Sequence, residues 1–395
     1  MKRTKGFWRN NAKLMTISLI VAVGLAYLML YKLGSLVIGM SADEIKAASA
    51  PVGLHGVFHN LLQLPMQIVR SIVFVIAPDH GQTLSRLPNA LFGSMAVLSF
   101  GLLIWLWHGA RTAILTTLLF ATSAWTLHVS RYVSFDVIYL WAIPTLLLIQ
   151  VFLHRYGEKS YVWYGSLAIW GMLLYVPGLI WLMLIQLYCQ RGLIIKTANN
   201  FSSLQQRITS MLVIFIWLPL LILELTRDKQ FIAWLGLPDH FPSLMHLGKQ
   251  IVAVPVHLFI RGPQYPGLWL DKLPILDIFT LVMCLLGIYF YARNYKATRS
   301  QTLLLLFVGG VILVGMGGAV SISALVSLMY IFAGAGIAYL LHEWLKVFPL
   351  NPLARGVGIG LVSIAVLLSC LYGLRSYFIA WPHNYATRIT FRYHR

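Results

Sequence analysis

The sequence predicts an all-α protein, a polytopic transmembrane helical bundle of about 11 spans with external helices at the membrane interface. Three observations support this prediction, and the first two come from composition. Of the 395 residues 59% are hydrophobic and only 10% are charged, and the mean hydropathy is +0.78. A soluble domain carries about 25% charged residues. Third, apolar runs long enough to cross a bilayer recur along the chain, and short clusters of Lys and Arg separate them.

The N-terminal segment predicts the orientation of the bundle. Five basic residues lie between Lys2 and Lys13 and precede an apolar run from Leu14 to about Ile38. By the positive-inside rule, the N-terminus is cytoplasmic and the next segment, SADEIK, lies outside. The first run is too long for a signal peptide and lacks a small-residue cleavage site, so we expect an uncleaved span.

The rest of the chain supplies the other expected spans. The segment from His55 to Ile76 is apolar but interrupted by polar residues and Arg70. We expect it to lie along the interface, because an arginine at the bilayer centre costs about 2.5 kcal/mol or more. Further spans are expected at about 87–107, 112–127, 137–153, 208–223, 274–291, 303–318, 322–341 and 357–377, with two short spans meeting at Pro177 and Gly178 between 161 and 189.

The charge and cysteine content exclude several functions. Lys and Arg number 30 and Asp and Glu 11, a net charge of +19, but the basic residues lie in turns between apolar runs. We therefore expect no nucleic-acid partner. Cys189, Cys284 and Cys370 lie in or beside apolar runs without a pairing motif, so neither a disulfide framework nor a zinc site is predicted.

The expected topology gathers four of the 11 acids and several cations on the external face. The adjacent pair Asp43 and Glu44 follows the first span, and Asp136 precedes a later one. Such a mixture suits a reaction that needs a carboxylate base beside cations that hold a phosphate leaving group. The external set is Asp43, Glu44, Asp79, His80, Arg86, Arg131, Asp136, His240, Arg261 and Lys272.

The acid pair, Asp136 and Arg86 also have structural explanations that need no active site. Ser41 could cap a short helix whose first turn holds the two acids. Asp136 could be an interfacial partner of Arg131, and Arg86 could extend to the lipid headgroups.

Two further groups have structural alternatives as well. His55 and His59 have the i, i+4 spacing of helix metal ligands, but no third ligand is near, so interfacial polar residues are the better interpretation. Tyr265 and Trp269 could stack on a sugar, although an aromatic belt at the interface is the better explanation.

Three stretches resemble the GT-C integral-membrane glycosyltransferases, in particular the bacterial branch similar to dolichyl-phosphate-mannose protein mannosyltransferases and lipid A aminoarabinose transferases. They are SADE (41–44), RLPNALFGSMAVL (86–98) and ATSAWTLHVSRYVSFD (121–136). The resemblance covers the first third of the chain well, and the rest only as a pattern of spans. It implies one integral-membrane domain, 1–395, with a GT-C-like catalytic module (1–160, external loop 40–86) and a variable module (161–395, external loop 224–273).

The resemblance also implies an activity. A sugar would pass from a polyprenyl-phosphate donor to a protein or lipid-linked glycan acceptor at the outer face of the inner (plasma) membrane, with inversion. Asp43 would be the catalytic base, with Glu44 beside it and Asp136 positioning a substrate. Arg86 would neutralise the carrier phosphate. Arg131, Arg261 and Lys272 are assigned to the same phosphate on predicted sidedness alone.

Two departures from the family shape the expectations for cofactors and acceptor. Metal-using members carry a second acid near that of the second external loop, whereas residues 132–141 offer only Asp136. We therefore expect no cofactor and no obligatory metal. Many members continue into a soluble external domain, and this chain stops shortly after Trp381 and Pro382, so we expect a partner or a small or lipid-linked acceptor.

Two alternatives belong to other functional classes. A transporter or flippase of a lipid-linked saccharide would use the same carboxylates and arginines for binding or proton coupling. Transporter sites lie near the middle of the membrane in broken spans, whereas these charges are expected in external loops. A scaffold that has lost activity would not need Asp43, Glu44 and Asp136 together.

Overall fold

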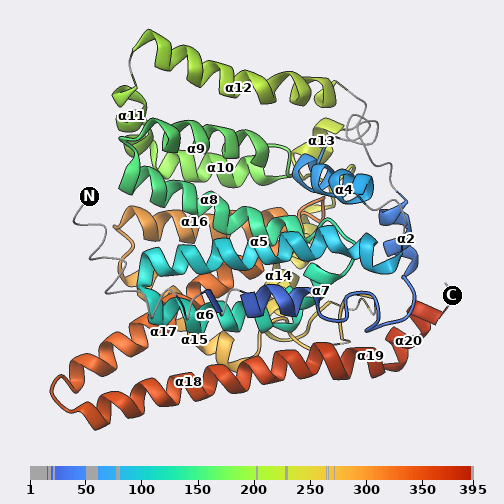
Figure 1. Cartoon of the computed structure of the whole chain (residues 1–395), viewed down its shortest axis with the longest axis vertical. Coiled ribbons are helices and arrows are strands. Elements are labelled where there is room, and N and C mark those ends of the chain that lie inside the picture. Colours follow the sequence, from blue (N-terminus) through green and yellow to red (C-terminus); the bar gives the residue numbers. More distant parts are fainter. Residues whose placement is uncertain are drawn as a thin grey trace.

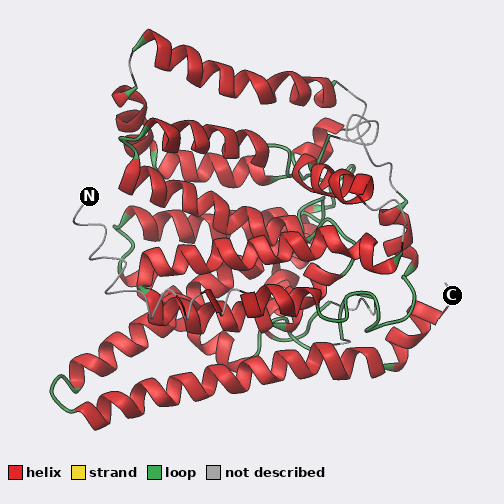
Figure 2. Ribbon diagram, in the orientation of Figure 1, coloured by secondary structure: helices red, strands yellow, loops and turns green. Residues whose placement is uncertain are grey.

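The computed structural model describes residues 16, 19–20, 23–49, 61–76, 81–201, 203–226, 230–263, 265, 267–270 and 272–392. The regular structure of these residues is helical throughout (Figure 2). The all-α prediction is confirmed. The helices are α2 (Ala42–Ala48), α4 (Leu64–Ile76), α5 (Gln82–His108), α6 (Ala110–Thr122), α7 (Ala124–Arg131), α8 (Val137–Tyr156), α9 (Ser160–Leu173), α10 (Leu179–Cys189), α11 (Arg191–Asn200), α12 (Leu204–Leu225), α13 (Gln230–Trp234), α14 (Leu244–Phe259), α15 (Ile278–Arg293), α16 (Thr298–Gly315), α17 (Ser323–Val347), α18 (Pro352–Arg375), the π-helix Ser376–Ala380, α19 (Trp381–His383) and α20 (Tyr385–Arg392).

The long helices lie side by side and form one bundle (Figure 1). At its centre α8 and α17 are largely buried, with runs of fully enclosed side chains from Val137 and from Ser323 onward. Glycines allow α15 and α17 to approach closely. A Cβ at Gly287 would collide with the carbonyl of Phe332, and one at Gly336 with the carbonyl of Met283. Glycine permits this contact because it has no side chain that would keep the two backbones apart.

Five helices are long and apolar enough to cross a membrane, or seven if two bent pairs each count as one span. The pairs are α6 with α7, bent by 59°, and α10 with α11, bent by 78°. Only the described residues enter this count, and the total of about 11 stays a prediction. The domain division at residue 160 also stays a prediction.

Two segments have the local form that the sequence predicts. The chain turns between α9 and α10 at Gly178, whose φ of 72° suits glycine. The helix α4 has 13 residues, which is about 20 Å at 1.5 Å per residue and shorter than the roughly 30 Å of the hydrocarbon core.

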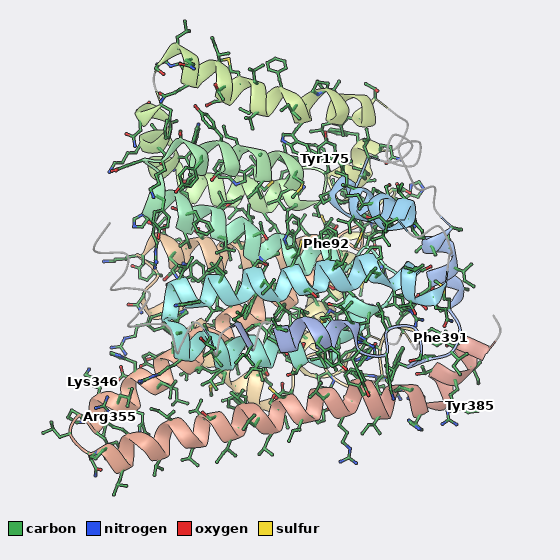
Figure 3. All side chains as sticks on the ribbon, in the orientation of Figure 1. Phe92, Tyr175, Lys346, Arg355, Tyr385 and Phe391 are labelled. Atoms are coloured by element: carbon green, nitrogen blue, oxygen red, sulfur yellow. The ribbon has the colours of Figure 1, made fainter. Side chains whose placement is uncertain are left out.

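Different charged residues lie at the two ends of the bundle. Lys346 and Arg355 lie at the end where α17 turns into α18, and Tyr385 and Phe391 of α20 lie at the opposite end (Figure 3). The basic turns that follow α8 and α15 belong to the first of these ends, because successive long helices run in opposite directions. Asp43 on α2 and Asp136 before α8 belong to the second.

Candidate active site

The short helix α2 directs its two adjacent carboxylates to different environments. Ser41 caps the helix: its hydroxyl accepts the Glu44 N–H at 3.2 Å, and the Glu44 carboxylate accepts the Ser41 N–H at 3.2 Å. This reciprocal pair is a capping box, so the helix-cap alternative is correct for Ser41 and Glu44. Neighbouring helix positions differ by about 100°, and Asp43 is therefore left exposed while Glu44 is fully buried.

Glu44 binds α2 to the rest of the bundle. Its Oε1 accepts Arg86 Nε at 2.9 Å and the Val133 N–H at 3.1 Å, and its Oε2 accepts Arg86 Nη2 at 2.8 Å. With the Ser41 N–H these contacts are four hydrogen bonds to a side chain that is 0% exposed. They connect α2 to the start of α5 and to the segment that precedes α8.

Arg86 is buried and does not extend to the headgroups. Beyond its ion pair with Glu44 it donates to the carbonyls of Leu33 and Gly39, at 3.2 and 3.1 Å. Only 4% of the residue is exposed. The guanidinium therefore forms its hydrogen bonds with partners inside the protein.

Arg131 at the end of α7 is buried in the same way. It donates to the Tyr377 hydroxyl at 3.0 Å and to the carbonyls of Leu28, Met29 and Tyr31. Arg131 therefore does not pair with Asp136, contrary to the alternative given above.

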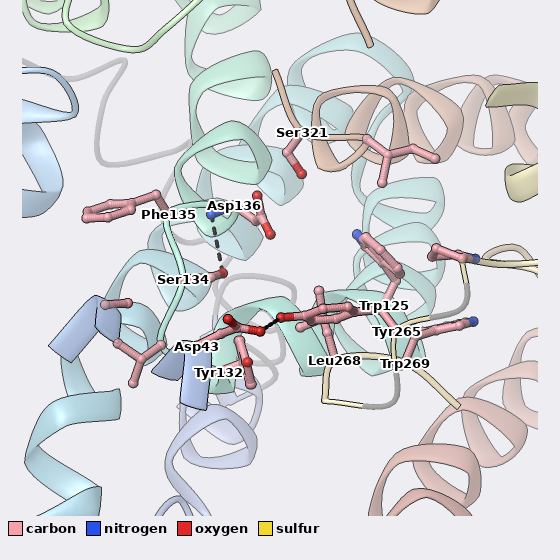
Figure 4. A pocket seen from close by; sticks show the side chains of 14 residues that line it. Asp43, Trp125, Tyr132, Ser134, Phe135, Asp136, Tyr265, Leu268, Trp269 and Ser321 are labelled. Atoms are coloured by element: carbon pink, nitrogen blue, oxygen red, sulfur yellow. Dashed lines mark hydrogen bonds between the residues drawn. The ribbon is translucent and has the colours of Figure 1, made fainter. Parts of the chain in front are cut away.

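Asp43 and Asp136 line one cavity of about 400 Å³, which we call the carboxylate cavity (Figure 4). Five segments form it: α2, α7 through Trp125, residues 132–136 between α7 and α8, the loop around residues 263–269, and residues 321–322 before α17. Glu44, Arg86 and Arg131 do not line it, and Arg261 and Lys272 are exposed and also lie outside the lining.

Two tyrosines hold the start of α2 at the rim of the carboxylate cavity, one through Asp43 and the other through Ser41. The Tyr265 hydroxyl donates to Asp43 Oδ2, and the Tyr132 hydroxyl lies 2.6 Å from Ser41 Oγ. Burial raises the pKa of Tyr132 to about 12, and burial together with the hydrogen bond to Asp43 raises the pKa of Tyr265. Both hydroxyls therefore keep their protons at neutral pH.

Asp136 lies deeper in the same cavity, as the residue that precedes α8. Burial raises the pKa of its carboxyl, and the nearby hydroxyls of Ser321 and Ser134 partly oppose that rise. The Asp136 N–H donates to Ser134 Oγ at 3.3 Å. A partly buried carboxylate beside two hydroxyls is suited to accept hydrogen bonds from a polar ligand.

Two tryptophans form an apolar wall of the cavity. The indole N–H of Trp125 donates to Ser323 Oγ at 3.1 Å, and that of Trp269 to the Leu273 carbonyl at 2.7 Å. Both side chains are buried, and their ring centroids are 5.1 Å apart. The interface-belt explanation is therefore wrong for Trp269.

Several predicted residues do not contribute to this site. Asp79, His80, His55 and His59 lie outside the described residues, and His240 is exposed in the loop before α14. Within the described part of the chain no three His, Cys, Asp or Glu side chains are grouped so that they could hold a metal ion. The expectation of no obligatory metal stays a prediction.

The sequence prediction missed Tyr132, Trp125 and Ser321. Tyr132 and Trp125 both lie in the stretch 121–136 that carries the resemblance, so their position there could have identified them. Nothing in the sequence around Ser321 indicates that it reaches a cavity more than 270 residues from Asp43 along the chain.

Comparison with known proteins identifies the fold through structure alone. No protein-family model and no curated protein sequence matches the chain. ArnT from Cupriavidus metallidurans bound to undecaprenyl phosphate is similar over 95% of this chain and 77% of its own, with a TM-score of 0.56 and 12% identity.

Archaeal structures give similar matches. An Archaeoglobus fulgidus oligosaccharyltransferase tethered to an acceptor peptide containing the NVT sequon is similar over 92% of this chain and 55% of its own, with a TM-score of 0.52 and 13% identity. AglB from the same organism, in complex with an inhibitory peptide and a dolichol-phosphate, is similar over 93% of this chain and 56% of its own, with a TM-score of 0.51 and 12% identity. The chain spans little more than half of these two proteins. The helical bundle described above therefore has the same fold as ArnT and these archaeal oligosaccharyltransferases.

Proposed function

We propose that the protein is a glycosyltransferase that moves a sugar from a polyprenyl-phosphate donor to an acceptor at the outer face of the cell membrane. The observation that carries the proposal is the exposed Asp43 carboxylate at the rim of a cavity that also holds Asp136, within a GT-C fold. Support comes from the similar proteins, of which one structure contains undecaprenyl phosphate and another a dolichol-phosphate.

In the proposed reaction Asp43 is the general base. The acceptor's hydroxyl or amine attacks the anomeric carbon, the bond from that carbon to the phosphate oxygen breaks, and polyprenyl phosphate leaves with the bonding electrons. Asp43 takes the acceptor's proton and later releases it to water. Attack opposite to the leaving group inverts the anomeric centre. A polyprenyl phosphate is already a leaving group, so a base and electrostatic stabilisation suffice.

The carboxylate cavity suits a sugar. Its volume of about 400 Å³ is within the range of ligand pockets, about 300–1,000 Å³. Asp136 and Ser321 would accept hydrogen bonds from sugar hydroxyls, and the wall formed by Trp125 and Trp269 would contact the apolar face of the ring.

The donor phosphate needs a cation, and four were predicted. Arg261 and Lys272 are exposed on either side of the loop that carries Tyr265, and they can meet a phosphate without losing internal partners. Arg86 and Arg131 would have to exchange buried contacts to do so. We therefore favour Arg261 and Lys272 for the phosphate, and we propose that Glu44 and Arg86 position α2.

The experiment is a donor screen in proteoliposomes. Release of free polyprenyl phosphate from a set of radiolabelled polyprenyl-phosphate sugars is compared for wild type, Asp43→Asn and Asp239→Asn, an exposed acid outside the cavity. We expect a fall of about 10²- to 10⁴-fold for Asp43→Asn and no change for the control. Normal turnover by Asp43→Asn ends the assignment of the base. Movement of labelled lipid between leaflets without release would instead indicate a transporter.

A further inference from the structure

A second cavity, of about 500 Å³, lies at the opposite end of the bundle from the carboxylate cavity. It is formed by the ends of α5 and α8, the junction of α10 and α11, and the start of α16. Along α8, His154 in this cavity is 18 residues from Asp136 in the other, which is about 27 Å of helix. We call it the basic cavity.

The lining of the basic cavity is positive. Arg155 and Arg299 contribute to it, and its described lining contains no Asp or Glu. The start of α16 adds to this potential because Thr298 and Arg299 are its first two residues and no side chain caps it. Helix N-termini present unpaired N–H groups and a partial positive charge.

Arg299 is held by contacts of its Nη2 and of its guanidinium face, and its buried Nε is left without a partner among the described residues. Its guanidinium carbon lies 3.8 Å from the ring centroid of Trp107, and Nη2 donates to the Tyr291 hydroxyl at 2.5 Å and lies 2.7 Å from His108 Nε2. A buried donor without a partner is unfavourable, so an acceptor that reached it would be bound favourably.

A second polar atom of the lining also lacks a partner. Gln150 Oε1, from α8, is buried and accepts no hydrogen bond from the described residues. An amide oxygen needs a donor, which a bare phosphate at neutral pH supplies poorly and a hydroxyl group supplies well. The cavity therefore presents cationic donors and one neutral acceptor.

We propose that the basic cavity binds a phosphate ester that carries a free hydroxyl group, with the phosphate on Arg299 and Arg155 and the hydroxyl on Gln150. The same chemistry occurs in a soluble polyol phosphate and in the headgroup of a glycerol-bearing anionic lipid. This site is independent of the transferase function, and its test needs no turnover.

The test measures binding to the full chain in neutral detergent by titration calorimetry. The probes are glycerol 3-phosphate, dihexanoyl phosphatidylglycerol and inorganic phosphate. We expect saturable binding of at least one glycerol-bearing probe, with a Kd raised about tenfold or more in Arg299→Gln. The matched control is Arg355→Gln, an exposed arginine at the same end of the bundle that does not line the cavity. Equal weakening by both variants would reduce the effect to general surface charge and overturn the proposal.

A variant that fills the cavity keeps the test valid if Arg299→Gln does not fold. A Cβ at Gly192 meets nothing within 4 Å, so Gly192→Trp places bulk in the cavity without removing a charge. Gly356→Trp, equally unhindered but outside the cavity, is its control. We expect only Gly192→Trp to abolish binding, and unchanged binding would overturn the site.

The choice of probe then identifies the source of the ligand. Binding of glycerol 3-phosphate alone assigns a soluble ester, and binding of the lipid alone assigns a headgroup. Gln150→Leu should remove the preference of either glycerol-bearing probe over inorganic phosphate. A preference that survives in this variant would contradict the hydroxyl contact.

Discussion

The carboxylate cavity and the basic cavity are similar in size, about 400 and 500 Å³, and opposite in charge. The first contains two carboxylates, Asp43 and Asp136, and its described lining contains no Lys or Arg. The second contains Arg155 and Arg299 and no described carboxylate. One bundle thus has carboxylates in a cavity at one end and arginines in a cavity at the other.

The difference shows that the partners of a charge, and not its presence, decide what it can do. Arg86 and Arg131 lie close to the carboxylate cavity, but backbone carbonyls and Glu44 occupy their donors. Arg299 has fewer partners and keeps a donor for a ligand. A count of arginines at each end would have missed this.

The largest expected effect concerns the buried ion pair behind the carboxylate cavity. Arg86→Leu leaves Glu44 buried and charged without its partner, and breaking such a pair costs about 3–5 kcal/mol of unfolding free energy. Chemical unfolding in detergent measures it. Asp43→Asn, on the same helix but exposed, should change stability little. Equal stability of the two variants would contradict the structural role of the pair.

Next in size is the hydroxyl that holds Asp43. Tyr265→Phe removes the hydrogen bond to Asp43 Oδ2 while it keeps the ring in the cavity. Hydrogen bonds to charged groups contribute about 1.5–3 kcal/mol, and we expect release of polyprenyl phosphate to slow about tenfold or more. Tyr385→Phe, exposed at the same end of the bundle, is the control. A rate equal to wild type would show that Asp43 needs no such support.

A smaller effect concerns pH. The pKa of Asp136 is raised above its usual 3.8, so its contribution to stability is fully present below that value and is lost as pH rises through the raised pKa. Relative to Asp136→Asn, the wild type should therefore lose thermal stability as pH rises from 3.8 through the raised pKa of Asp136. Melting curves of both proteins across this range measure the difference. A difference that stays constant, or that favours the wild type at high pH, would be inconsistent with burial of this carboxyl.

The smallest expected effects are those of each cavity on the other. Arg299→Gln should leave transfer unchanged, and Asp43→Asn should leave binding of the phosphate ester unchanged, because the sites are about 27 Å apart along α8. Transfer and binding assays on both variants test this. A change of more than about twofold in either direction would mean that the ends of the bundle are coupled.

The fold was predictable because apolar runs and basic turns are linear features of the sequence. The helices α5 and α8 begin within about five residues of the expected spans, and the turn at Gly178 was located from two residues. The bends were not predictable. The expected span 112–127 is two helices separated at Ser123, whose hydroxyl accepts the Thr126 N–H and starts a new helix.

The site was predictable in part. Asp43 and Asp136 were identified from their positions after and before apolar runs, and the structure brings them into one cavity. Separating Asp43 from Glu44 required knowledge of which side of α2 faces the bundle, and this depends on contacts with Arg86 and Val133. The role of Trp269 depends on how its loop folds back over α7, which no local pattern specifies.

The two buried arginines have a consequence for the order in which the chain can fold. Arg86 and Arg131 together satisfy the carbonyls of residues 28, 29, 31, 33 and 39, where the chain leaves the helical residues 23–30 and approaches α2. During synthesis the ribosome makes that segment well before either arginine. We expect Asp43 to reach its place only after residue 131 has been made, and the carboxylate cavity to be complete only after residue 322, the last described residue of its lining.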